Sequence, residues 1–340
     1  MHLANLVHAQ CKSHGTETIV DLGAGLGYMC QILHCLYGYQ VLGLERDKEN
    51  VNRARARQCK FYSDSLAKVK YVHCEVTCDS ADTIESTLRR EFPDVSTNVC
   101  LIGLHACGDL SINASRLFCK MKSVKLCILI SCCYHKLSIC DNARSSTQRK
   151  QYFHNFPTSA SLREVIATCD FDVGQFLRVP FLRLACQESA DKWRDMSREK
   201  HDEHSFYVLA RAVLELYSQR NNLVLKKKVR KSTRKSQCSN FQSYIKDSLL
   251  RYDLVSDMNA KLTERDELEK DITQMWEKEK RRLKDVEIYT GLQLMLQLPA
   301  ESFILQDRLC WLHEQGLEAT IVPVMDKCIS PRSYAIVSHK

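Results

Sequence analysis

The sequence lacks the long apolar run that a membrane-spanning helix needs, since no stretch approaches roughly 18 consecutive apolar residues. It also lacks a charged N-terminal region followed by an apolar stretch, so we expect no secretory signal. Internal repeats are missing as well, which argues against a repeat architecture. These absences predict a protein without a membrane partner that is not secreted, located in the cytoplasm, the nucleus or both.

Cysteine, in contrast, is abundant, because 18 of the 340 residues are cysteines. In a secreted chain this number would suggest disulfides, but here many of the cysteines fall within predicted buried strands. Reduced thiols in the cytoplasm or nucleus explain that distribution better. The hydrophobic content of 44% is enough for a sizeable core, and the length allows one large domain or two ordinary ones.

Residues 19–27 combine a buried strand with a glycine-rich turn. Ile19, Val20 and Leu22 suit an interior strand of a parallel sheet, and the three glycines that follow let the backbone approach a ligand closely. A dinucleotide-binding fingerprint requires its third glycine at the position of Tyr28. The spacing Asp-x-Gly-x-Gly-x-Gly instead resembles the first motif of class I S-adenosylmethionine-dependent methyltransferases. A nicotinamide-dependent oxidoreductase is the alternative.

The chain continues with alternating strands and helices, as a doubly wound fold requires. Apolar spacing predicts a helix over 28–37, ended by Gly38. Further strands are predicted over 40–45, 69–75, 98–105 and 124–131, and two more over 318–324 and 333–338. The spacing of the first five strands predicts a Rossmann-like α/β fold with a parallel sheet and right-handed crossovers. The methyltransferase resemblance implies a seven-stranded sheet, which the last two strands complete. Ligands bind outside the carboxyl ends of such strands, so the strand ends should surround one crevice.

A large insertion separates the fifth strand from the sixth. We expect a cofactor-binding core over residues 1–138, a mostly helical insertion over 139–308, and the last two strands within 309–340. Residues 206–217 carry an apolar stripe at helical spacing, and a second helix is expected over about 259–286. Residues 226–235 include seven basic residues, and such a run is typical of a disordered loop.

Two segments at the ends of the fourth and fifth strands carry a more specific resemblance. Leu104-His-Ala-Cys-Gly-Asp-Leu110 and Ser131-Cys-Cys-Tyr-His135 resemble motifs of the methyltransferase-like 25 family and its 25B branch, and the similarity returns at 307–308 and 330–337. A looser similarity links the motifs to acceptor-stem tRNA 2′-O-methyltransferases. The resemblance implies a class I methyltransferase fold with S-adenosyl-L-methionine as cofactor, and the name of the 25B branch implies methylation of ribosomal RNA. Family members carry a longer segment before the first strand, so it also implies an N-terminally short form.

The strand ends supply the candidate cofactor site. Glu45 follows the glycine loop by about 20 residues, where an acid accepts hydrogen bonds from ribose hydroxyls. A solvated acid at the end of a strand is the alternative. The residues expected to bind the cofactor are Asp21, Gly23, Ala24, Gly25, Gly27, Glu45, Arg46, Glu75 and His105.

For catalysis we expect His105, Asp109, Tyr134 and His135. His105 or Asp109 accepts a proton from the methyl acceptor; otherwise His105 ties two strand ends together and Asp109 caps the following helix. Tyr134 stacks on a target base or lines the acceptor pocket, the alternative being ordinary packing. The Asn-Pro-Pro-Tyr signature of amino-group methylases is missing at the fourth strand, so the residues do not assign adenine N6 chemistry.

Zinc-ligand residue types occur near the same strand ends, namely His105, Cys107, Cys132, Cys133 and His135. No Cys-x-x-Cys pair accompanies them, and adjacent cysteines on a strand point to opposite faces. We therefore expect no metal site. A nucleophilic-cysteine mechanism at Cys133 is a minor alternative, since the Pro-Cys context of such enzymes is missing.

The charge of the chain bears on its partner. The net charge of +8 and the basic run from Lys226 to Lys235 favour a polyanion, although the run also fits a nuclear import signal or a solubilising linker. We interpret the chain as an S-adenosylmethionine-dependent methyltransferase that modifies RNA, either ribosomal or transfer RNA. A protein methyltransferase and a catalytically weak cofactor-binding scaffold are the alternatives.

Overall fold

The computed structural model describes residues 1–94, 98–140, 152–229, 233, 238, 240–256 and 265–340. They form two compact units, of which the first comprises residues 1–189 and 296–340 and the second residues 190–295. These limits differ from the predicted boundaries at 138 and 308, because the two ends of the insertion pack with the sheet-containing unit. Within the described ranges, no helix is both long and apolar enough to cross a membrane.

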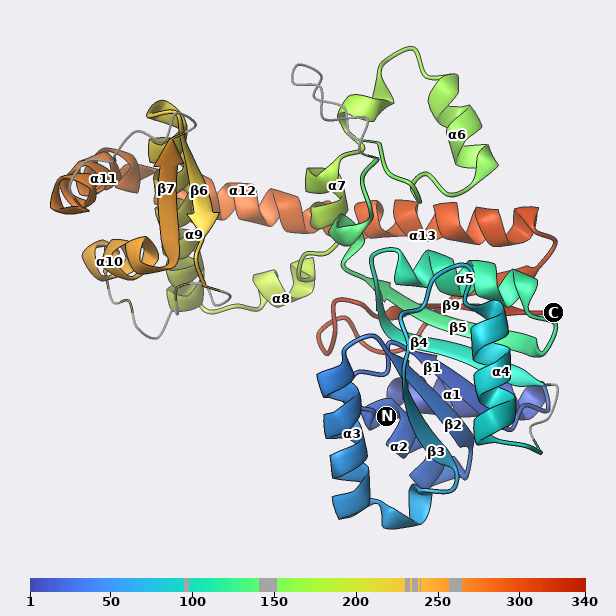
Figure 1. The fold of residues 1–340 in the computed structure, drawn as a ribbon. Coiled ribbons are helices and arrows are strands. Elements are labelled where there is room, and N and C mark those ends of the chain that lie inside the picture. The colour runs from blue at the N-terminus through green and yellow to red at the C-terminus, as the bar shows by residue number, and fades with distance from the viewer. Residues whose placement is uncertain (95–97, 141–151, 230–232, 234–237, 239, 257–264) are drawn as a thin grey trace. The chain divides into compact units, whose positions relative to one another are not determined.

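Seven strands form the sheet of the first unit (Figure 1): β1 (Thr18–Leu22), β2 (Gln40–Glu45), β3 (Val69–His73), β4 (Val99–Cys107), β5 (Val124–Cys132), β8 (Glu318–Pro323) and β9 (Tyr334–His339). Their order is β3-β2-β1-β4-β5-β9-β8. The first five strands are parallel to one another, and β9 is antiparallel to both β5 and β8. The predicted seven-stranded sheet of the class I methyltransferase fold is confirmed.

Helices cover both faces of this sheet. On one face lie α1 (His2–Ser13), α2 (Tyr28–Tyr37) and α3 (Lys48–Phe61). On the other lie α4 (Ala81–Glu91), α5 (Leu110–Lys120) and α13 (Gln297–Glu314). The central strands are therefore buried on both sides, which explains why their sequences are continuous apolar runs rather than alternating patterns.

The turn after β1 shows why one position of the loop must be glycine. Gly27 has a φ of 70°, and a Cβ there would lie 2.3 Å from the ring of Tyr71 on β3. The Tyr71 hydroxyl donates a hydrogen bond to the Gly27 carbonyl oxygen at 3.1 Å and accepts one from the Gln31 amide nitrogen at 3.0 Å. The loop thus rests directly on a buried aromatic ring, and only a residue without a side chain allows that contact.

The first unit is completed by shorter elements around the end of β5. They are a 3-10 turn (Tyr134–Lys136), α6 (Ala160–Ala167) and α7 (Val179–Leu184). The 3-10 turn and α7, together with α13, contribute to an apolar cluster that includes Tyr134, Leu182 and Ile304. This cluster lies next to the carboxyl end of β5 and so borders the predicted site.

The second unit has an aromatic core of its own. It contains α8 (Ala190–Arg194), α9 (Arg198–Arg220), α10 (Phe241–Arg251), α11 (Arg265–Glu279), α12 (Leu283–Met295) and an antiparallel pair of strands, β6 (Leu223–Lys227) and β7 (Tyr252–Ser256). The rings of Phe241 and Trp276 stack 4.4 Å apart, and Phe206 meets Trp276 edge-on at 5.3 Å. The apolar stripe predicted over 206–217 contributes the buried face of α9.

The structure differs from two predictions for this unit. The single helix expected over 259–286 is divided, because a 3-10 turn over 280–282 separates α11 from α12; residues 257–264 lie outside the described residues. The sequence around this turn, 277–282, has no apolar side chain to hold it against the core. Lys226 and Lys227, expected in a loop, instead end β6, where backbone pairing with β7 leaves their side chains exposed.

Replacing Gly27 by alanine is expected to destabilise the first unit strongly. The added methyl group strains a left-handed backbone and also meets the Tyr71 ring, and the two effects together cost roughly 2–5 kcal/mol. Gly38, at the other end of α2, is the matched control, because its φ is 77° but a Cβ there meets no atom within 4 Å. Gly38→Ala should cost only about 1–2 kcal/mol. Urea unfolding measures the difference, and equal losses would contradict the contact assigned to Tyr71.

Candidate functional site

A cavity of about 540 Å³ opens at the carboxyl ends of the parallel strands. Six of the predicted site residues line it: Gly23, Glu45, Arg46, Glu75, His105 and Asp109. They follow or end four different strands, β1, β2, β3 and β4, which parallel pairing brings to one edge of the sheet. Sequence positions up to 86 residues apart (109 − 23) therefore share one wall.

Glu45 joins the glycine loop to the end of β2. Its Oε2 accepts a hydrogen bond from the Gly25 amide and its Oε1 accepts one from the Asp47 amide, both at 2.9 Å. Each carboxylate oxygen keeps a further lone pair, so Glu45 can still accept hydrogen bonds from ribose hydroxyls. A Cβ at Gly25 would meet no atom within 4 Å, which leaves room for a ligand against the loop. These features fit the nucleoside part of S-adenosylmethionine.

Asp21 lies beneath the glycine loop rather than in the cavity wall. Its side chain is buried, and its Oδ2 accepts a hydrogen bond from the Cys30 thiol at 3.3 Å. Burial raises the pKa of Asp21 to about 6; the Cys30 hydrogen bond opposes this shift and the charge of Glu45 adds to it. Ala24 and Gly27 likewise shape the loop without lining the cavity. The predicted cofactor residues thus divide into those that face the cavity and those that support the loop.

An irregularity in the pairing near the end of β4, between Leu104 and Ala106, presents His105 to the cavity. Its φ is 62°, an uncommon conformation for a non-glycine residue, and the residue is exposed at the cavity wall. Gly108 is also left-handed, with a φ of 55°, and a Cβ there would lie 2.8 Å from the Lys136 carbonyl oxygen. Glycine at this position lets the turns after β4 and β5 come into contact.

Asp109 occupies the N-cap position of α5, as the alternative from the sequence expected, but its side chain makes no capping hydrogen bond to the helix. Its Oδ2 instead accepts hydrogen bonds from the amide and the hydroxyl of Ser138, at 2.9 and 2.5 Å. Its Oδ1 accepts one from the Asn155 side chain at 2.6 Å. The carboxylate reaches across to the segment after β5 rather than back to its own helix, and it holds that segment against the cavity wall.

Tyr134 and His135 lie outside the cavity wall. Tyr134 is 0% exposed and its hydroxyl donates a hydrogen bond to Glu301 Oε1 at 3.1 Å. The expectation that it stacks on a base or lines the acceptor pocket is therefore wrong, and it packs in the core. His135 Nδ1 lies 3.4 Å from Cys186 Sγ, and burial, together with nearby basic side chains, lowers its pKa. The 3-10 turn after β5 directs Tyr134 toward the apolar cluster and His135 toward Cys186, so neither side chain reaches the cavity.

Sequence reasoning missed the C-terminal residues that hold this turn and the start of α6. Glu301 is buried, forms an ion pair with buried Arg332 at 3.2 Å and accepts the hydrogen bond from Tyr134. Asp307 accepts hydrogen bonds from the amide and the hydroxyl of Ser159, at 2.9 and 2.7 Å. Arg332 and Asp307 lie in the segments that share the family resemblance, so a signal was present, but their partners are too distant in sequence to be inferred from spacing.

Three thiols gather beside the cavity. The sulfur atoms of Cys107, Cys132 and Cys133 all lie within 4.8 Å of one another. The expectation that adjacent cysteines face opposite ways does not hold, because Cys133 has a φ of 28° and lies beyond the end of β5. His105 and His135, the other residues weighed as zinc ligands, are not members of this group.

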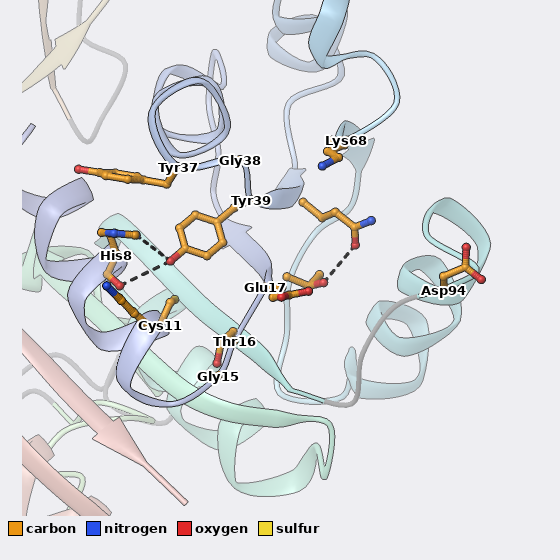
Figure 2. Close-up of a pocket in the computed structure, with 13 residues that line it drawn as sticks. His8, Cys11, Gly15, Thr16, Glu17, Tyr37, Gly38, Tyr39, Lys68 and Asp94 are labelled. Atoms are coloured by element: carbon orange, nitrogen blue, oxygen red, sulfur yellow. Dashed lines mark hydrogen bonds between the residues drawn. The ribbon is translucent and has the colours of Figure 1, made fainter.

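A second cavity, of about 620 Å³, lies at the opposite edge of the sheet (Figure 2). Residues near the starts of β1 and β2 line it, among them Glu17 and Tyr39. A hydrogen bond of 3.0 Å joins His8 Nδ1 to the Tyr39 hydroxyl in its wall. Although this cavity is larger, it is far from the glycine loop and lies at the amino ends of the strands. We therefore place the candidate site at the carboxyl edge, where parallel sheets bind ligands.

Known proteins resemble the chain over its first 140 residues and, in two cases, over most of its length. A family described as a methyltransferase domain matches residues 1–140. The protein named probable methyltransferase-like protein 25 of Homo sapiens is 29% identical over 297 residues, which cover 87% of this chain and 44% of that protein. The Mus musculus protein of the same name is 27% identical over 304 residues, covering 88% of this chain and 44% of that protein.

Several solved structures show limited similarity to the chain. The methyltransferase domain of bacterial CtHen1 is 15% identical, with a TM-score of 0.29 over 38% of this chain and 64% of that chain. The N-terminal domain of EvdMO1, bound to S-adenosylhomocysteine, is 20% identical, with a TM-score of 0.28 over 37% of this chain and 48% of that chain. The fold assignment rests on the strand order of the sheet.

The glycine loop, the carboxyl-edge cavity and the family match together define the first part of the chain. Residues 1–140 form a methyltransferase domain, and the cofactor that such a domain implies is S-adenosyl-L-methionine. Over most of its length the chain is similar to the proteins named probable methyltransferase-like protein 25. It spans less than half of the length of these relatives, 44% in each case.

Asp21→Asn should remove a pH-dependent loss of stability. The Asp21 pKa is about 6 in the folded protein against an ordinary value of 3.8, so the folded state binds the proton more tightly than the unfolded state. The stability of the wild type therefore falls as the pH rises through this range and stays lower above it. Between pH 5 and pH 7.5 the wild type should lose about 1 kcal/mol relative to the variant. Urea unfolding at the two pH values measures this loss, and identical pH dependence in both proteins would contradict it.

Proposed function

We propose that this chain transfers a methyl group from S-adenosyl-L-methionine to an RNA, either ribosomal or transfer RNA. The observation that carries the proposal is that Gly23 of the glycine loop, the acid Glu45 and the exposed imidazole of His105 line the same cavity. A donor-binding loop and a proton acceptor at one cavity are what methyl transfer to a hydroxyl or amine requires.

The donor half of the site is supported by the hydrogen-bonding capacity of its wall. When bound, S-adenosylmethionine supplies an electrophilic methyl group on a sulfonium sulfur. Glu45 would accept hydrogen bonds from the ribose hydroxyls, while its bond to the Gly25 amide keeps the glycine loop beside it. Arg46 and Glu75 complete the wall after β2 and β3. These residues would bind and orient the donor, while His105, near the end of β4, lines the same cavity on the acceptor side.

On the acceptor side, His105 is the group that we assign to proton transfer. It is exposed at the cavity, and an imidazole can accept a proton from an acceptor hydroxyl or amine. The Asp109 carboxylate is engaged by Ser138 and Asn155, which favours a positioning role for it. The burial of Tyr134 and the contact of His135 with Cys186 leave these two side chains without a direct role.

Positive charge supports a polyanionic acceptor. The net charge is +8, and Lys226 and Lys227 expose their side chains at the end of β6. Residues 230–232, 234 and 235 of the basic run lie outside the described residues. Contacts between lysine or arginine and phosphate weaken as salt rises, so RNA binding should be salt-dependent. An RNA acceptor agrees with a location in the nucleus or the cytoplasm.

Glu45→Gln should weaken the binding of S-adenosylhomocysteine by about 10- to 100-fold, because charged hydrogen bonds to the ribose are lost. Glu49→Gln is the matched control, since Glu49 lies nearby on α3, outside the cavity wall, and pairs with Arg53 at the surface. Isothermal titration measures the affinity, and circular dichroism verifies the fold. Absence of binding to the folded wild type would contradict the donor site, and tight binding of NAD instead would favour the oxidoreductase alternative.

His105→Asn should lower methyl incorporation by about 100-fold or more, with a much smaller effect on donor affinity, because a general base is removed. His2→Asn, at the exposed start of α1, is the control. Incorporation is measured with methyl-tritiated donor and total RNA, followed by nuclease or protease digestion. Label released by nuclease supports the proposal, whereas label released only by protease assigns a protein acceptor. Donor binding without any labelling would favour the scaffold alternative.

A further inference from the structure

Cys107 and Cys132 face each other at the carboxyl ends of β4 and β5. They are in-register partners of the two parallel strands, and their sulfur atoms lie 2.9 Å apart. Both are free thiols. Neither takes part in the function proposed above, so the close contact of two thiols at the cavity requires its own explanation.

The backbone around this pair suits a disulfide. Neighbouring strands lie about 4.8 Å apart, which falls inside the range of Cα separations that a disulfide spans. In-register partners of a parallel pair also point their side chains to the same face of the sheet. The sulfur atoms must approach by only about 0.9 Å to reach bonding distance, so the strands need not separate or change register.

The two cysteines differ in accessibility as an attacking and a resolving thiol should. Cys107 is half-buried and lines the 540 Å³ cavity, whereas Cys132 is only 6% exposed. The pKa of Cys107 is lowered to about 6, mainly because its sulfur accepts a hydrogen bond from Cys132. A hydrogen bond from Cys133 and the charge of Lys136 lower this pKa further, while burial opposes the shift. Cys107 is therefore largely a thiolate at neutral pH, the form that reacts with peroxides.

We propose that Cys107 and Cys132 are an oxidation site, which hydrogen peroxide converts into a disulfide in the wall of the donor cavity. The Cys107 sulfur attacks one peroxide oxygen, so an S–O bond forms, the O–O bond breaks and the departing hydroxide takes up a proton as water. The Cys132 sulfur then attacks the resulting sulfenic acid, giving an S–S bond while the S–O bond breaks and a second water leaves with the Cys132 proton. Two electrons pass from the dithiol to the peroxide.

This inference goes beyond the proposed function and does not depend on the identity of donor or acceptor. Cys74 provides an internal comparison, because it lines the same cavity and is also partly buried. Its thiol, however, contacts the backbone carbonyl oxygen of Glu75 at 3.8 Å, and burial raises its pKa. Access to the cavity alone should therefore not make a thiol reactive here.

The test uses the full chain, reduced, freed of reductant and exposed briefly to hydrogen peroxide at neutral pH. Free thiols are then blocked and the chain is digested with trypsin, which separates the two cysteines into peptides 91–116 and 126–136. Mass spectrometry should find these peptides linked, with fragment ions that place the bond between Cys107 and Cys132, and two thiols per chain should be lost. In Cys107→Ser the link should be absent, while Cys74→Ser should behave as the wild type.

Several outcomes would overturn the proposal. One is a bond between Cys132 and Cys133 or between two chains; another is a reduced Cys107 after Cys74 has been oxidised. Stoichiometric zinc in the purified protein, lost when Cys107, Cys132 or Cys133 is replaced, would make the cluster a metal site instead. The peptide map of the wild type decides the matter even if Cys132→Ser does not fold, and the same map on protein unfolded in guanidinium shows whether the selectivity depends on the fold.

Discussion

Parallel pairing joins β4 to β5, with a register shift at His105, and the candidate site is arranged around the end of that pairing. The pairing continues through Ala106–Ser131 and Cys107–Cys132 to the end of both strands. Because the strands end together, the turns that follow them meet, and Gly108 allows the Lys136 carbonyl oxygen to pass close by. His105 on one side and the thiols on the other are consequences of the same contact.

A second constraint comes from the far end of the chain. The turn after β5 is held by Glu301, which is 167 positions from its partner Tyr134 in the sequence. Burial raises the pKa of Glu301, and the charge of Arg332 opposes that shift. Breaking such a buried pair by removing one partner is costly, because it leaves an uncompensated charge. The interrupted sheet is therefore not a simple insertion, since the chain after the insertion is needed to support the site formed before it.

Much of the fold followed from local patterns. The predicted strands agree with the observed ones to within about two residues at each end, because buried parallel strands are short apolar runs bounded by turns. The helix after the glycine loop ends at Gly38 as expected, where a φ of 77° suits glycine. The helix over 259–286 was less predictable, since its apolar spacing continues across a charged stretch that forms a separate turn. Local periodicity indicates which residues can be buried, not whether the helix axis is continuous.

The residues that face the cavity show where inference from the sequence ends. The glycine spacing and the acid Glu45 were sufficient to predict a donor loop, because the backbone conformation and the strand length needed there are local properties. The direction of each side chain after β4 and β5 is not local. Asp109 turns to Ser138 and Tyr134 turns to Glu301 because those partners satisfy their polar atoms in the folded chain. The sequence by itself determined the order of the strands along the chain, the loop and the set of candidate residues. Only the tertiary structure decided which of them reach the cavity, because burial and hydrogen bonding between distant segments orient the side chains.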